Sequence, residues 1–339
     1  MDWLGEADIA FANLETTLAK SRDYYHPRPS YYRLRADPSN AEDLRSLGID
    51  IVSLANNHQF DYGEEGFIDT IKALDSAGIK HMGAGIDLEE AISPAIINVK
   101  GEKFAFLGFA TVCQKHASSD RSGVAGIRKK IVYEFASSRL PTHYLPFYSS
   151  LPTIKEIPNE EDVQRMQDCI ERVRDEVDFV VVSIHWGPGI AIRSGGKLST
   201  YIFEAIPTNC QRLLGHSIVD AGADLVIGGH PHSAQGIEFY KDKPIFYSLG
   251  NTAMQIEADI ARCVLFMQEA YMVKVDTEKK KSTKVEILPT RTDETGLPMI
   301  TEDYKNVIKH LKEVSLSLNA SVIPSKKGAI VEPIKHKKG

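Results

Sequence analysis

The stretch Gly228-Gly229-His230-Pro231-His232 decides how the rest of the chain is interpreted. It follows a run of apolar residues that is typical of a buried strand. Two imidazoles therefore lie just past a strand end, where glycine and proline supply the chemistry of a tight turn. Neutral imidazole is a common ligand of divalent metals. The stretch alone fits either a metal-binding loop or a polar turn, and the other strand ends decide between them.

Four further apolar runs also end in polar side chains that can bind a metal or a substrate. They end at Glu15, at Asn57 with His58, at His185 and at Asn251. In open α/β sheets, sites form outside the carboxyl ends of the strands. Carboxylate, amide and imidazole groups together suit Mn²⁺, Zn²⁺ or Fe²⁺ rather than Ca²⁺. The pattern predicts an α/β fold with one or two such ions at one sheet edge, where they would activate a water.

Several of these residues also have a plain structural explanation. His58 could be a hydrogen-bonded core histidine, although its polar neighbours disfavour an apolar site. Glu15 could cap a turn and Asn251 could be a turn residue. Asp61 either orients His58 or caps the helix that begins near residue 64. The convergence of several strand ends favours the functional interpretation.

Composition excludes some classes of protein. The chain has 339 residues, 42% of them hydrophobic, and a formal net charge of -6, which argues against bulk binding to nucleic acid. Its four cysteines are widely spaced, as expected for reduced thiols. No apolar run approaches the roughly 18 residues of a membrane span, and there is no signal-peptide pattern. We expect a cytoplasmic protein without a membrane span, and the oligomeric state stays open.

The order of the motifs suggests one domain over residues 1–320. Residues 111–158 lack clear periodicity and are expected to form either a lid or a surface insertion. The lysine-rich residues 321–339 are expected to form a mobile tail. Arginines in and near the expected loops could clamp a carboxylate or phosphate of a substrate, or could be ordinary surface charge; they are Arg28, Arg33, Arg35 and Arg193.

Five motifs in the order found here resemble the capsule-type poly-γ-glutamate synthesis (CapA-like) family, a branch of the calcineurin-like metallophosphoesterase superfamily. The matching stretches are Ala7-Asp8 to Asn13-Leu14-Glu15, Ser53-Leu54-Ala55-Asn56-Asn57-His58 with Asp61-Tyr62-Gly63, Ser183-Ile184-His185-Trp186-Gly187, Asp220-Ala221-Gly222-Ala223-Asp224 through Gly229-His230-Pro231-His232, and Tyr247-Ser248-Leu249-Gly250-Asn251. The resemblance implies a four-layer α/β/β/α sandwich of the metallo-dependent phosphatase type.

The resemblance also assigns roles to residues. It implies that His58 is the acid or oxyanion stabiliser, and we add Asp61 as its catalytic partner. The implied metal ligands are Glu15, Asn57, His185, His230 and His232, with Glu15 near the position of a bridging carboxylate. Residues beside these ligands are candidates for substrate contacts, namely Asn13, Asn56, Trp186, Arg33, Arg35 and Asn251.

One departure from the family pattern concerns the first metal ligand. The family opens with a strand ending in Gly-Asp, whereas only Asp2 and Asp8 precede Asn13 here. We therefore expect the N-terminal strand to be missing, either because the start is truncated or because this branch has lost a ligand. The expected function is a metal-dependent hydrolase or transferase acting on a phosphoester or on a γ-glutamyl, amide-type substrate that is small or polyanionic. The alternative is a non-catalytic component of a polyglutamate synthesis or export complex.

Overall fold

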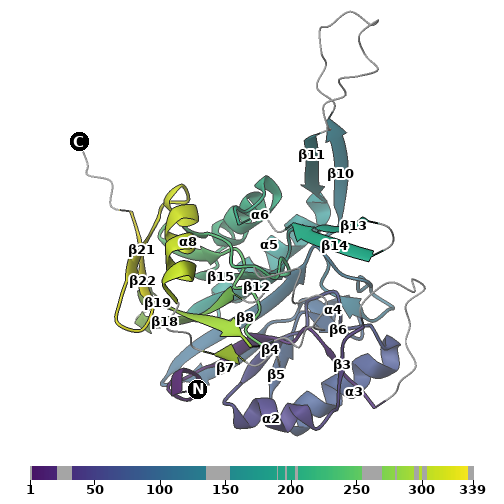
Figure 1. Cartoon of the computed structure of the whole chain (residues 1–339). Helices are drawn as coiled ribbons and strands as arrows, with labels where there is room; N and C mark the ends of the chain where they lie inside the picture. The colour runs from purple at the N-terminus through teal and green to yellow at the C-terminus, as the bar shows by residue number, and fades with distance from the viewer. Residues whose placement is uncertain are drawn as a thin grey trace, which may run out of the picture.

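Figure 1 shows the computed structural model of the chain. The structure describes residues 2–20, 33–134, 153–188, 190–194, 197–202, 205–253, 269–278, 281–293, 298–299 and 304–334. Across these ranges the fold is mixed α/β, with several sheets and seven helices. None of the helices described is long and apolar enough to cross a membrane.

A three-stranded parallel sheet carries the first half of the site. Its order is β1-β4-β5, with β1 at Phe11–Asn13, β4 at Ile51–Ser53 and β5 at Lys80–Met82. Helices α2 (Asn40–Ser46) and α3 (Gly63–Ser76) share a core cluster with it. The apolar residues of α3 are spaced to face the core, and Phe67 and Leu74 are fully buried. The chain leaves α3 at Gly78, whose φ of 70° suits glycine.

A six-stranded sheet carries the second half. Its order is β16-β17-β15-β12-β8-β7, and its strands are β7 (Ala95–Val99), β8 (Glu102–Ala110), β12 (Phe179–His185), β15 (Leu225–Gly229), β16 (Ile237–Tyr240) and β17 (Lys243–Phe246). The four strands β8, β12, β15 and β17 run parallel. β12 is buried along its whole length, as its apolar sequence predicts. Register places His185 beside Gly229, so β12 and β15 deliver their loops to one edge.

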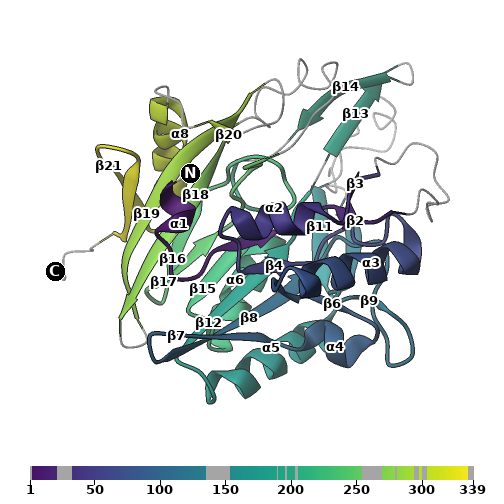
Figure 2. The ribbon, with the colours of Figure 1, turned by 90° about the horizontal axis from the view of Figure 1, so that it is seen from below.

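Helices α5 (Glu160–Arg174) and α6 (Asn209–Asp220) pack with the six-stranded sheet in one large core cluster. Asn159 caps α5 by accepting from the Asp162 amide at 3.1 Å, and Met166 and Ile170 are buried. A second cluster joins side chains of both sheets to the C-terminal elements. Figure 2 shows α2 and α3 on one side of the molecule and α5 on the other.

The chain after residue 268 adds a further sheet with a helix. Its elements are β18 (Glu269–Glu278), β19 (Lys281–Thr292), β20 (Pro298–Met299), α8 (Tyr304–Leu316), β21 (Ala320–Pro324) and β22 (Ala329–Pro333). The expectation of a mobile tail over 321–339 is wrong for residues 321–334. Val322 and Val331 are each 2% exposed, and β22 pairs with β21 on one side and with β19 on the other. Residues 335–339 lie outside the described part.

Residues 111–158 do not form one unit either. Residues 111–128 leave the end of β8 and return to it, since the Ile127 amide donates to the Ala110 carbonyl at 2.8 Å. They include β9 (Gly123–Val124), which pairs with β6 (Ala84–Gly85). The hairpin of β10 (Lys129–Glu134) and β11 (Thr153–Pro158) then projects from the body (Figure 1). Residues 135–152 lie outside the described part, so the expectation of a lid or a surface insertion is not decided there.

The remaining elements are short. They are α1 (Asp2–Gly5), β2 (Thr17–Leu18), β3 (Arg35–Ala36), α4 (Leu88–Ile92), β13 (Ile190–Ser194) and β14 (Lys197–Ile202). The last two form an antiparallel hairpin. The first strand of the chain is β1, and Asp8 before it pairs with Lys100 at 2.8 Å instead of reaching the site.

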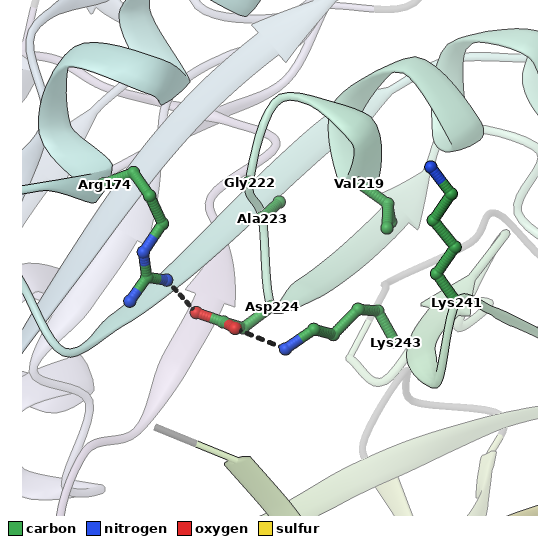
Figure 3. Close-up of a pocket in the computed structure, with 7 residues that line it drawn as sticks. All are labelled: Arg174, Val219, Gly222, Ala223, Asp224, Lys241 and Lys243. Atoms are coloured by element: carbon green, nitrogen blue, oxygen red, sulfur yellow. Dashed lines mark hydrogen bonds and ion pairs between the residues drawn. The ribbon is translucent and has the colours of Figure 1, made fainter. Parts of the chain in front are cut away.

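The amino end of the six-stranded sheet is held by one buried carboxylate. Asp224 accepts a hydrogen bond from the Val180 amide at 2.9 Å and one from Lys243 at 2.7 Å, and it also pairs with Arg174. Figure 3 shows the two cations on either side of Asp224. This cluster, which we call the Asp224 clasp, ties the start of β15 to the start of β12 and to α5.

Candidate metal centre

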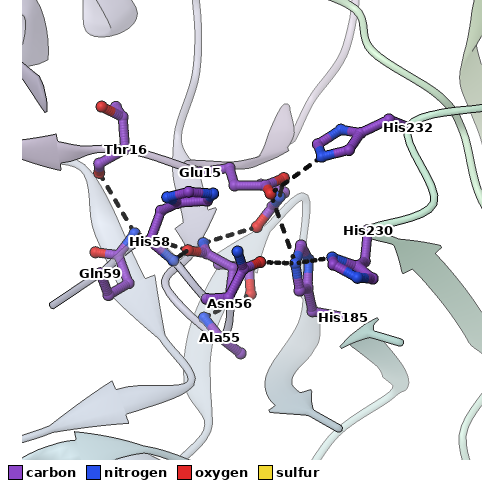
Figure 4. Close-up of polar contacts among 12 residues, drawn as sticks. Glu15, Thr16, Ala55, Asn56, His58, Gln59, His185, His230 and His232 are labelled. Atoms are coloured by element: carbon purple, nitrogen blue, oxygen red, sulfur yellow. Dashed lines mark hydrogen bonds and ion pairs between the residues drawn. The ribbon is translucent and has the colours of Figure 1, made fainter. Parts of the chain in front are cut away.

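The carboxyl ends of β1, β4, β12 and β15 bring the predicted ligands together. Glu15 follows β1, Asn57 follows β4, His185 ends β12 and His230 follows β15. The sheets are parallel at these strands, so each chain segment leaves its sheet at the same edge. Figure 4 shows the side chains of Glu15, His185, His230 and His232 turned toward one another.

Three ligand-type atoms surround the Nε2 atom of His185. Asn57 Oδ1 lies 2.6 Å from it, His230 Nδ1 lies 3.1 Å from it and Glu15 Oε1 lies 3.6 Å from it. On the far side, His232 Nε2 lies 3.7 Å from Glu15 Oε1. The ligand atoms of Glu15, His185 and His230 all lie within 4.8 Å of one another. This is the arrangement expected around one small cation.

The donor set fits a divalent metal better than it fits a hydrogen-bonded network. A neutral imidazole carries one N–H, so His185 Nε2 can donate to only one of its neighbours. Glu15 Oε1 is buried and has no hydrogen-bond partner, although burying an unpartnered polar atom is unfavourable. A cation of the Mn²⁺, Zn²⁺ or Fe²⁺ type would accept lone pairs from all of these atoms at once.

Burial keeps the two central histidines in the neutral form that binds metal. Burial and, less strongly, the nearby His230 and His232 hold the pKa of His185 well below its usual value. Burial and His232 lower the pKa of His230 to about 3. Both rings therefore present lone pairs at neutral pH without losing a proton first.

The backbone of the loop after β15 is shaped for the site. His230 has φ 98° and His232 has φ 55°, a region that residues other than glycine rarely adopt. Such conformations cluster at functional sites. Gly228 is needed for a different reason, since a Cβ there would lie 2.2 Å from the Tyr247 carbonyl oxygen. The loop that carries the two imidazoles therefore begins where the end of β15 lies in close contact with the residue that follows β17.

His58 and Asp61 form a buried pair next to these ligands. His58 Nδ1 lies 2.7 Å from Asp61 Oδ2, and Asp61 is completely buried. Asp61 also accepts from the Leu34 amide at 2.7 Å and from Gln114 Nε2 at 2.5 Å. The structure thus favours the orienting role of Asp61 over a helix cap. Gln114 was missed from the sequence, because nothing in the aperiodic segment 111–128 distinguishes it.

The candidates for substrate contacts are placed unevenly. Asn56 is 1% exposed and donates to Asn13 Oδ1 and the Leu14 carbonyl, so its side chain braces the two loops. Asn13 donates to Glu15 Oε2 at 3.2 Å and so orients that carboxylate. Asn251 Oδ1 lies 2.8 Å from His232 Nδ1. These asparagines contact the candidate ligands or the loops that carry them, and the substrate contacts expected for them stay a prediction.

The aromatic and basic candidates lie outside the ligand cluster. Trp186 is 1% exposed and donates to the Tyr247 carbonyl at 2.8 Å, so it packs in the core beneath the site and offers no face to a substrate. Arg35 is exposed, donates to the Ala19 carbonyl and lies over the Tyr62 ring. Arg33 is half-buried. Arg28 and the side chain of Arg193 lie outside the described part.

Comparisons with known proteins agree with the motifs. The profile of the family described as "Bacterial capsule synthesis protein PGA_cap" matches residues 1–255. The capsule biosynthesis protein CapA of Bacillus anthracis is 28% identical over 252 residues, which are 74% of this chain and 51% of that protein. The chain therefore spans about half the length of that relative.

Two further relatives match over more of the chain. A probable polyglutamine synthesis accessory protein of Mycobacterium tuberculosis is 27% identical over 317 residues, covering 90% of this chain and 72% of its own length. The PGA biosynthesis protein CapA of Bacillus subtilis is 24% identical over 313 residues, covering 91% and 69%. With its profile matched over residues 1–255, the chain belongs to the bacterial capsule synthesis protein family.

Proposed function

We propose that the chain is a metal-dependent hydrolase or transferase of capsule or poly-γ-glutamate biosynthesis. The observation that carries this proposal is the convergence of four side chains, Glu15, Asn57, His185 and His230. The Oε1 atom of Glu15 is buried among them and has no hydrogen-bond partner. The strand order and the helices on two sides support a four-layer α/β/β/α sandwich of the metallo-dependent phosphatase type.

The residues divide into those that hold the metal and those that move a proton. Glu15, Asn57, His185 and His230 would hold one ion of Mn, Zn or Fe, and His232 with Glu15 would begin a second position. A bound ion supplies a Lewis acid that polarises the reacting bond and lowers the pKa of water. Asp61 fixes His58 through Nδ1, so Nε2 is the ring nitrogen that would give a proton to the leaving group or stabilise a developing oxyanion.

The substrate is proposed from chemistry and from the names of the relatives. The printed names of relatives refer to capsule, PGA and polyglutamine synthesis. A γ-glutamyl chain is polyanionic, and the arginine-bearing segment 33–35 is tied to Asp61 through the Leu34 amide. Arg33 and Arg35 would therefore meet a carboxylate or phosphate of the substrate near the His58 pair. Both a phosphoester and a γ-glutamyl amide fit this arrangement.

A second candidate is a non-catalytic component of a polyglutamate synthesis or export complex that retains a degenerate site. It is favoured by the small number of acidic ligands: within the described ranges, one cluster of acidic and histidine side chains has metal-site geometry, and Glu15 is its one carboxylate. Asp8, which precedes Glu15 in the sequence, pairs with Lys100 and does not supply a second carboxylate. Such a protein would bind metal and polymer without turnover.

Elemental analysis and a substrate panel test the proposal. Purified protein is expected to contain about one transition metal ion per chain and to cleave a phosphoester or a γ-glutamyl amide when supplied with Mn²⁺. Chelator should abolish the activity, and His230→Ala should lose both the metal and the activity. Turnover by the His230→Ala protein at the wild-type rate would refute the proposal. Metal binding without turnover on the whole panel would favour the second candidate.

A further inference from the structure

A segment between β8 and β9 links the two halves of the site. Residues 111–122 begin beside β12, where the Thr111 amide donates to the carbonyl of His185 at 2.9 Å. The same segment then reaches the loop after β4, where Gln114 Nε2 lies 2.5 Å from Asp61 Oδ1. Lys115 Nζ follows at 2.6 Å from Glu64 Oε1. We call residues 111–122 the strap, because it contacts both a metal ligand and the proton-transfer pair.

The strap completes the set of donors around a carboxylate that is fully buried. Asp61 Oδ2 accepts from the Leu34 amide and lies 2.7 Å from His58 Nδ1, while Gln114 faces Asp61 Oδ1. A carboxylate inside a protein needs such donors, since an unsatisfied charged oxygen is strongly unfavourable. Gln114 donates to the second oxygen, Oδ1, and thereby fixes the rotation of the Asp61 carboxylate.

We propose that Gln114 is a positioning residue that acts through Asp61 on His58. With Oδ1 held by the amide N–H of Gln114, Oδ2 points at the imidazole and requires a proton on its Nδ1. The Nε2 atom of His58 then faces the reaction as a lone pair or as an acid, and not as a fixed neutral donor. The role in catalysis rests on the proposed function, whereas the effect on the imidazole tautomer does not.

The main alternative is that the strap is only structural. Lys115 offers a matched control, since it anchors the same strap to Glu64 at 2.6 Å. It also donates to Ser122 Oγ within the strap at 2.9 Å, and neither of these contacts involves Asp61. If the strap acts only by holding the loops together, loss of either anchor should have similar effects. If Gln114 orients the carboxylate, the effect of replacing Gln114 should depend on the presence of Asp61, and the effect of replacing Lys115 should not.

The test uses the full chain with Gln114→Met, which keeps the volume and removes the donor, and Gln114→Ala as a second variant. Each is made in the wild-type and Asp61→Asn backgrounds, with Lys115→Met as the control. For the substrate found in the panel, we expect kcat to fall about tenfold to a hundredfold with KM and Mn²⁺ affinity unchanged. In the Asp61→Asn background, loss of Gln114 should have no further effect, while Lys115→Met should act equally in both.

A second readout is independent of turnover. The ring ¹⁵N shifts of His58 in the metal-free protein should show the Nδ1–H tautomer in the wild type and a mixture in Gln114→Met, with Lys115→Met like the wild type. Equal losses of kcat in both backgrounds, or an unchanged tautomer in Gln114→Met, would overturn the proposal. If the wild type turns nothing over, the proposed function fails while the tautomer still decides the role of Gln114.

Discussion

Replacing Glu15 by glutamine should raise the stability of the metal-free protein and lower that of the metal-bound protein. The carboxylate oxygen Oε1 is buried without a partner, 3.6 Å and 3.7 Å from ring nitrogens of His185 and His232. An amide N–H at this position could donate to one of those nitrogens. Removing the unsatisfied atom is worth about 1–3 kcal/mol in the absence of metal. The same change removes an anionic ligand from the ion.

The two effects can be converted into melting temperatures. An unfolding entropy of about 2.1 cal/mol/K per residue gives about 0.7 kcal/mol/K for 339 residues. The metal-free variant should therefore melt about 1–4 °C higher than the metal-free wild type. Mn²⁺ at a hundredfold excess over Kd stabilises by about 2.7 kcal/mol, or about 4 °C. If Kd rises about a hundredfold, the shift at the same concentration falls below about 1 °C.

Differential scanning calorimetry of chelator-stripped protein, with and without Mn²⁺, measures both quantities. Asp8→Asn is the matched control, because it removes a carboxylate from an exposed pair with Lys100. It should leave the metal-induced shift intact and change the melting temperature by no more than about 1 °C. A full metal-induced shift in Glu15→Gln, or a metal-free variant that melts below the wild type, would refute the assignment of Glu15 as a ligand.

Three further predictions concern the frame of the site. Asp224→Ala should destabilise the protein by about 3 kcal/mol, since it leaves Arg174 and Lys243 without their carboxylate partner. The Mn²⁺ affinity measured by calorimetric titration should stay the same. Gly228→Ala should prevent folding or lower the melting temperature by several degrees, because its Cβ would meet the Tyr247 carbonyl oxygen at 2.2 Å. Because the pKa values of His185 and His230 are lowered in the folded protein, the unfolded chain binds more protons than the folded chain below about pH 6.5. Urea unfolding of the metal-free protein should therefore show the free energy of unfolding decreasing from about pH 6.5 toward pH 3. The decrease should be smaller in His230→Gln.

The clustering of the candidate ligands could be predicted from sequence because parallel strands convert position along the chain into position in space. An apolar run that ends in His185 and another that ends before His230 must deliver both side chains to one edge if the strands are parallel neighbours. The same logic placed Asn57 and Glu15. These predictions needed only the length of each run and the identity of the residue that follows it.

The functions of the surrounding residues could not be predicted in this way. Trp186 and Asn56 adjoin candidate ligands in sequence, yet Trp186 packs in the core and Asn56 braces two loops. Trp186 follows His185 at a strand end, where successive side chains point in opposite directions. Gln114 lies in a segment without periodicity, so only the tertiary fold reveals its contact with Asp61. The lysine content of residues 321–339 led us to predict a mobile tail and to miss β21 and β22. Their apolar residues are few, but several of them are buried in the cluster that joins the sheets to the C-terminal elements.

The Asp224 clasp and the candidate metal ligands lie at opposite ends of the same pair of strands. β15 has five residues, so at about 3.3 Å per residue the two ends are roughly 16 Å apart, beyond the screening length at physiological salt. Stability and chemistry are therefore adjusted at separate places. Substitutions that strengthen the amino end can offset losses caused by changes among the loops at the other end. Such an arrangement gives a lineage, or an engineer, room to alter what the loops bind while the sheet stays folded.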